Sequence, residues 1–208
     1  MSAFFEFGPF EEEAARKQQS LTQAPCALRN ELVALLESRG LTDADLARIR
    51  KITDVLLDLP LDRVYPNYVC HPIRIAGALA LHRETPHPEE TVLCLTHNAL
   101  EIGALEHVRR WLSPRTLQAI VDLTVDRSQD RRSGYLVAYY DRLAIRDLLV
   151  LRAFDKLDNL LAFETHRVPD GELDVLRDLV CPRLPETEAG LRDYLLNAAA
   201  RMDARATS

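Results

Sequence analysis

Hydrophobic residues recur every three or four positions along most of the chain, which is the spacing of an amphipathic α-helix. No stretch alternates apolar and polar residues as a half-buried strand does. The fold predicted is all-α, a single helical bundle over residues 25–208 preceded by an acidic N-terminal arm over residues 1–24. Helices are predicted over residues 25–40, 41–60, 71–82, 88–101, 113–125, 135–163, 171–180 and 186–203, the stretch 135–163 as two helices or one bent helix.

Three of these segments open on start signals for a helix. Thr42 and Ser113 are predicted N-caps, because a Ser or Thr hydroxyl accepts a hydrogen bond from the free backbone N–H groups of the first turn. Pro114 follows Ser113 at the first helical position, where proline is favoured. By the same rule, Pro72 places His71 at the N-cap of the segment 71–82.

Composition excludes several classes of function. The formal net charge of -6 disfavours nonspecific binding to nucleic acid, and no specific nucleic-acid partner is predicted. No apolar run reaches the roughly 20 residues that a membrane-spanning helix needs, so no membrane association is expected. The opening "MSAFFEFGPF" has no basic region before its aromatic residues and does not read as a secretory signal. The four cysteines are scattered without a CxxC pair, which suits reduced thiols and a cytoplasmic location.

Two polar residues, His97 and Asn98, interrupt the apolar run "TVLCLTHNAL". Burying such groups costs free energy unless each finds a partner, so they either bond to the protein or hold a ligand. Glu101 follows His97 by four residues, which would place its carboxylate on the same helix face as the imidazole. A hydrogen-bonded core histidine is the plainer alternative.

Two other predicted helices carry residues of the same chemical kind. His71 stands at the start of one, and Asp155 lies in the apolar run "VLRAFDKLDNL" with Asn159 one turn further on. Imidazole nitrogens and carboxylate oxygens together suit manganese, iron or zinc, so these side chains could form a divalent-metal site. Asp155 and its neighbour Lys156 could instead be an ordinary surface pair.

The order His…His…Asp on successive helices resembles the HD phosphohydrolase superfamily, and in particular the hydrolase domain of the RelA/SpoT alarmone enzymes. The resemblance covers about residues 28–170 and rests on "YVCHPIRIAGALA", "THNALEI" and "RAFDKLDNL", with support from "SPRTLQAIVDLTV". It implies an HD-type helical domain with His71, His97 and Asp155 as metal ligands. It also implies Glu101 as the catalytic carboxylate and Asn159 as a substrate contact.

The chain departs from the family at three points. Asn98 stands where the family has the aspartate of its His-Asp pair. Its amide oxygen carries no charge, and it is a candidate metal ligand and a candidate catalytic group. Ile102 replaces the second residue of an acidic pair, and "DRVYPNY" replaces an Arg-x-Ser-Gly loop that helps to read guanosine.

The function expected is metal-dependent hydrolysis of a phosphate or pyrophosphate ester in a small-molecule nucleotide, one similar to guanosine tetraphosphate being an example. Manganese is the expected metal, with iron and zinc as alternatives. Three cationic residues near the motifs are candidates for binding the phosphate: Arg63, Arg74 and Lys156. Two other functions remain open: a degenerate member that binds a nucleotide or a protein partner without turnover, and an oxygenase with two irons, which would need more ligands than these. The sequence predicts no oligomeric state.

Overall fold

The all-α prediction is confirmed. A computed structural model describes the chain, and every regular element among the described residues is helical. Among the described residues, no helix is long and apolar enough to cross a membrane. The chain divides into two compact units, Met1–Thr124 and Val125–Ser208. The boundary predicted at residue 24 stays a prediction. The described residues are 3–59, 68–126, 128–129, 134–162, 168 and 171–206.

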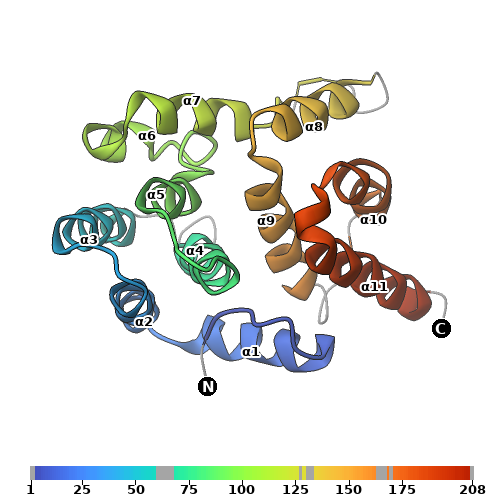
Figure 1. Cartoon of the computed structure of the whole chain (residues 1–208), viewed down its shortest axis with the longest axis horizontal. Coiled ribbons are helices and arrows are strands. Elements are labelled where there is room, and N and C mark those ends of the chain that lie inside the picture. The colour runs from blue at the N-terminus through green and yellow to red at the C-terminus, as the bar shows by residue number, and fades with distance from the viewer. Residues whose placement is uncertain are drawn as a thin grey trace. The chain divides into compact units, whose positions relative to one another are not determined.

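Helix α4 forms the centre of the first unit and is buried along nearly its whole length. It packs against α2 and α5, and α3 packs against the same two helices (Figure 1). Helix α5 also contacts α7, the last helix of the unit. The elements of this unit are α1 (Phe10–Thr22), α2 (Pro25–Ser38), α3 (Asp43–Asp58), α4 (Cys70–His82), α5 (Pro88–Thr96), α6 (Leu105–Val108), the 3₁₀ turn η2 (Arg109–Trp111) and α7 (Pro114–Leu123).

Two of the three predicted helix starts are confirmed. The side chain of Thr42 accepts a hydrogen bond from Asp45 N, and that of Ser113 accepts one from Thr116 N. The prediction for His71 is wrong, because α4 begins at Cys70. The backbone N–H of His71 donates to the carbonyl of Tyr68, so the chain is already helical before Pro72.

Phe4, close to the start of the described residues, packs against α4. Phe4 is only 2% exposed, and its ring occupies the space that a side chain at Gly77 would need. The buried carboxylate of Glu13 accepts a hydrogen bond from Gly8 N at 2.9 Å, which holds the segment before α1 in place. Residues 1–24 therefore include an acidic helix whose inner face is part of the core.

The second unit is built around α9. It packs against α8, α11 and the π-helical turn η3. The segment 135–163 forms two helices, one of the two outcomes predicted for it, and Asp147 takes a positive φ of 57° between them. The elements are α8 (Tyr135–Ile145), α9 (Leu149–Ala162), α10 (Glu172–Asp174), η3 (Val175–Val180), the 3₁₀ turns η4 (Cys181–Arg183) and η5 (Glu186–Glu188), and α11 (Ala189–Ala206).

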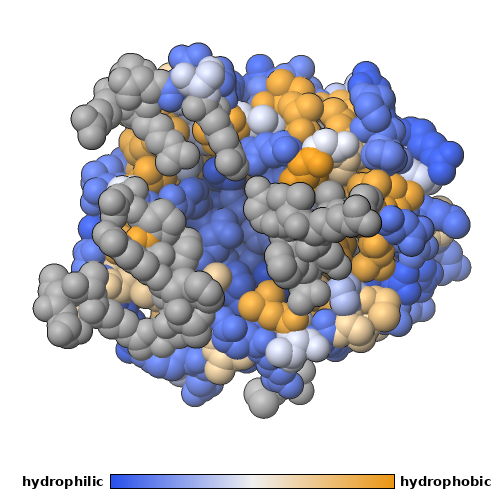
Figure 2. Space-filling model, turned by 180° about the vertical axis from the view of Figure 1, so that it is seen from behind, coloured by the Kyte–Doolittle hydropathy of each residue, from blue (hydrophilic) through white to orange (hydrophobic). Residues whose placement is uncertain are grey.

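Among the coloured residues in Figure 2, hydrophilic ones predominate, and separate apolar patches lie between them. Of the four cysteines, three are buried and all are free, which agrees with reduced thiols.

Candidate metal centre

His97 follows the last residue of α5 and is only 1% exposed. Its Nδ1 lies 2.7 Å from the backbone carbonyl oxygen of Cys94, one turn back along the helix. A carbonyl oxygen can only accept, so Nδ1 carries the hydrogen, and in the neutral ring the lone pair lies on Nε2. Histidines that bind metals are typically oriented in this way, with the second ring nitrogen donating to a carbonyl.

His71 lies in the first turn of α4 and is partly buried. Its ring centroid is 5.4 Å from that of His97 and 6.2 Å from that of Tyr68. The two histidines therefore face each other across α4 and α5, the helix pair at the centre of the first unit.

Asp155 lies on α9 and is 2% exposed. Its Oδ2 forms an ion pair with Arg152, which precedes it by three residues. Its Oδ1 accepts a hydrogen bond of 3.1 Å from Asn159 Nδ2, one turn further on. A buried carboxylate is tolerated only when it is paired, and α9 supplies two such partners.

The predicted ligands His71, His97 and Asp155 form a group that could hold a metal ion. Each offers one ligand atom, and these atoms lie within 4.8 Å of one another. The donor set, two imidazoles and one carboxylate, fits a first-row divalent metal, and the tautomer of His97 fits it as well.

Helix α5 is shorter than predicted. It ends at Thr96, and the residues from His97 to Gly103 form turns, so the expectation that Glu101 shares a helix face with His97 is wrong. Gly103 adopts a φ of 71°, and the N–H of Ala104 donates to the carbonyl of Ala99, which is how chains commonly leave a helix. Asn98 is partly buried in this turn, and Glu101 is exposed.

Of the three predicted phosphate-binding residues, the structure describes Arg74 and Lys156. Arg63 lies outside the described residues. Arg74 is buried, and its guanidinium lies 3.4 Å from the hydroxyl of Ser20 on α1. Lys156 forms an ion pair with Glu172, close to the start of α10. Arg74 and Lys156 thus have protein partners, and their binding of phosphate stays a prediction.

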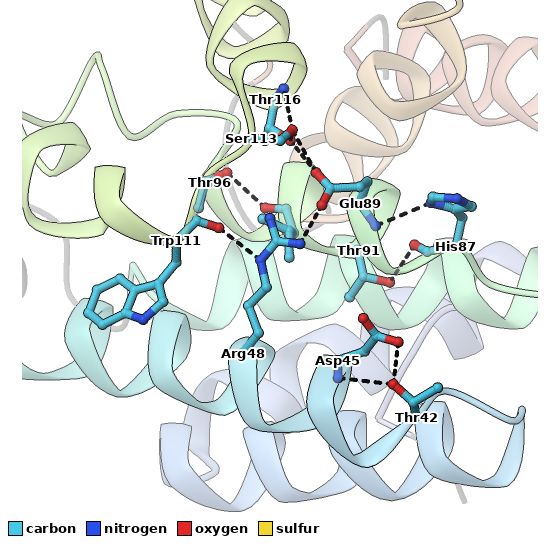
Figure 3. A network of polar contacts seen from close by, with 11 residues as sticks. Thr42, Asp45, Arg48, His87, Glu89, Thr91, Thr96, Trp111, Ser113 and Thr116 are labelled. Atoms are coloured by element: carbon cyan, nitrogen blue, oxygen red, sulfur yellow. Dashed lines mark hydrogen bonds and ion pairs between the residues drawn. The ribbon is translucent and has the colours of Figure 1, made fainter.

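A polar network that the sequence analysis did not anticipate braces the N-terminal end of α5. Arg48 on α3 forms an ion pair with Glu89 and donates from Nε to the carbonyl of Trp111 at 2.8 Å. The hydroxyls of Ser113 and Thr116 both donate to the second carboxylate oxygen of Glu89 (Figure 3). The network joins α3, α5, η2 and α7, and so fixes the helix that carries His97 at its other end. Residues bonded to each other in this network are up to 63 positions apart in the sequence, so local patterns do not predict the pairs that join different helices.

The network lowers the pKa of Glu89 from 4.5 to about 2. The hydrogen bond from Arg48 is the largest cause; burial acts in the opposite direction, and the two hydroxyls lower the pKa further. An acid whose pKa is lower in the folded protein stabilises it fully above the unfolded pKa, and this contribution is lost as the pH falls from 4.5 to 2. The effect is reduced because the side chain of Glu89 is 35% exposed.

Glu89→Gln is therefore expected to melt at a lower temperature than the unaltered protein at pH 7, with the difference narrowing as the pH is lowered from about 5 to 2.5. Thermal unfolding followed by circular dichroism at several pH values measures this. Glu106→Gln, which removes a largely exposed carboxylate, is the control for the loss of one charge. A difference that stays constant over this pH range would show that Glu89 braces α5 by packing alone.

No protein-family model, no curated protein and no solved structure matches the chain. The resemblance to the HD phosphohydrolases thus rests on its sequence motifs alone.

Proposed function

We propose that the protein is a metal-dependent hydrolase of the HD type that cleaves a phosphate or pyrophosphate ester of a nucleotide. The observation that carries the proposal is the group formed by His71, His97 and Asp155, the three residues that the motif order picks out. A largely buried group of titratable side chains with a donor set that suits a metal is a functional-site candidate.

The three side chains would hold the metal, with the amide oxygen of Asn98 as a further neutral ligand. Manganese is our expected metal, because mixed imidazole and carboxylate donors suit it, and iron or zinc would fit the same set. When bound, the ion would lower the pKa of a water molecule and polarise a phosphoryl oxygen. Asn159 would hold Asp155 in position and could also contact the substrate.

Glu101 is our candidate for the group that takes the proton from the attacking water. It follows His97 by four residues, in the turn after α5. Since general-base catalysis typically contributes 10²–10⁴-fold, Glu101→Gln should lower the rate of phosphate release about 100- to 10,000-fold and leave metal content unchanged. If the glutamate is instead a metal ligand, the same substitution would also reduce metal content. Full activity in Glu101→Gln would exclude both roles.

The experiment that tests the proposal is elemental analysis of the purified protein followed by a phosphate-release screen over nucleotides with added Mn²⁺. A bound first-row metal and turnover of at least one nucleotide support the proposal. Absence of both from the freshly purified and the Mn²⁺-loaded protein would contradict it.

A second function, nucleotide binding without turnover, is favoured by one feature. Asn98 supplies no negative charge at the position where the resembling family has an aspartate, so the centre binds a cation less strongly. In that case nucleotides would bind and raise the melting temperature, and no phosphate would be released.

A further inference from the structure

Both oxygens of the Asp155 carboxylate already have a partner on the same helix. Arg152 pairs with Oδ2, and Asn159 donates to Oδ1 at 3.1 Å. Arg152 brings a positive charge and Asn159 does not, so the arginine alone balances the charge of the carboxylate within α9. Each carboxylate oxygen has two lone pairs, so a metal ion could bind Asp155 while both partners stay in place.

Arg152 is held in its position by buried aromatic residues. Its side chain is 13% exposed, and its guanidinium carbon lies 5.9 Å from the centroid of the Tyr139 ring. A guanidinium keeps its proton throughout the pH range in which proteins stay folded, and the ion pair with Asp155 favours the charged form as well. The positive charge beside Asp155 is therefore permanent.

This charge acts on the metal site in two opposite ways. In the absence of metal it neutralises a carboxylate that would otherwise be buried and uncompensated, which stabilises the fold. When a divalent ion binds the same carboxylate, two like-charged groups share one counter-ion and repel each other. His71 and His97 bind metal as neutral rings and Asn98 is an amide, so Asp155 is the one charged side chain among these four proposed ligands.

We propose that Arg152 is a positioning residue that acts as the resident counter-ion of Asp155 and makes metal binding depend on an anionic, phosphate-bearing ligand. The inference rests on the proposed function, because it takes Asp155 as a metal ligand. The phosphate adds negative charge that offsets the positive charge of Arg152 beside the metal, so the metal and the phosphate bind cooperatively. The class of ligand that follows is a phosphate or diphosphate that reaches the site together with its divalent cation.

The test is a titration of the full chain with Mn²⁺, followed by the electron paramagnetic resonance signal of the free ion, with and without millimolar inorganic phosphate. In the unaltered protein, phosphate should increase Mn²⁺ affinity about 10-fold, within the ordinary range for coupling between two ligands. Arg152→Gln should bind Mn²⁺ about 10-fold more tightly without phosphate and gain less from its addition. Arg152→Lys keeps the charge and should behave like the unaltered protein.

The same variants distinguish an effect of charge on metal binding from an effect on the stability of the fold. Arg152→Gln leaves Asp155 uncompensated, so its melting temperature should fall without metal and recover with Mn²⁺ by more than that of the unaltered protein. Arg142→Gln is the matched control, since Arg142 also lies over Tyr139, at 5.4 Å, and its loss leaves the Arg152–Asp155 pair intact. If Mn²⁺ binds the unaltered protein and Arg152→Gln with equal affinity, the inference is wrong and the proposed function stands. If neither protein binds Mn²⁺, with or without phosphate, both fail.

Discussion

Asp155→Asn is expected to abolish Mn²⁺ binding in the presence of phosphate and to lower phosphate release at least about 1,000-fold. The side chain is the only carboxylate of the candidate metal group, so its loss leaves two neutral imidazoles. A metal ion contributes several kcal/mol to the stabilisation of a charged transition state, and each 1.36 kcal/mol corresponds to a factor of ten in rate. The measurements are metal content after dialysis and phosphate release from the nucleotide found to be turned over.

Asp158→Asn is the matched control for this substitution. Asp158 is a second buried aspartate on α9, three residues after Asp155, and is not a member of the metal group. Its variant should keep bound Mn²⁺ and activity. Equal losses in both variants would show that any buried carboxylate on α9 is needed for folding, and would remove the support for Asp155 as a ligand.

Gly77→Ala should destabilise the first unit by about 2 kcal/mol, a typical cost of overpacking a well-packed core. A Cβ at this position would come within 2.2–2.6 Å of three atoms of the Phe4 ring, so that the ring and the backbone around it would have to move. For a chain of this length the melting temperature should fall by roughly 4–8 °C, since 1 kcal/mol corresponds to about 2–4 °C. Thermal unfolding followed by circular dichroism measures this.

Two further variants identify the cause. Gly190→Ala is the matched control, because Gly190 lies in α11 with nothing near its missing side chain, and this change should be neutral or slightly stabilising. Combining Gly77→Ala with Phe4→Ala should cost less than the sum of the two single changes, since the clash disappears with the ring. Strict additivity would mean that Phe4 does not pack on α4.

Local rules predicted most of the helices, and the misses have identifiable physical causes. Thr42 and Ser113 were predictable as caps because a cap depends on residues two or three positions away. The end of α5 was not predicted, because the apolar pattern continues past it to Leu100, which is 41% exposed. Gly103 gave no signal for this end, because it lies well beyond Thr96 and is compatible with the longer helix that was predicted.

The candidate metal ligands were predicted from motif order, and Asn159 was placed one turn from Asp155, whereas Arg152 was not singled out. Arg152 could have been found from sequence, because residues three apart on a helix are neighbours and Arg152 stands three before Asp155. The ion pair between Arg48 and Glu89 could not have been predicted from the sequence. The two residues lie 41 positions apart, and their pairing depends on how α3 packs against α5.

The early end of helix α5 separates the residues of the candidate site into a fixed part and a turn. Its N-terminal end is fixed by the Glu89 network, and His97 follows its C-terminal end with a bond back to Cys94. Asn98 and Glu101 lie beyond that fixed point, in a turn that closes at Gly103. Under the proposed function, insertions or exchanges within the turn would change which groups lie near the substrate while the imidazole keeps its position. A few changes in the turn would then be enough to convert hydrolysis into binding without turnover.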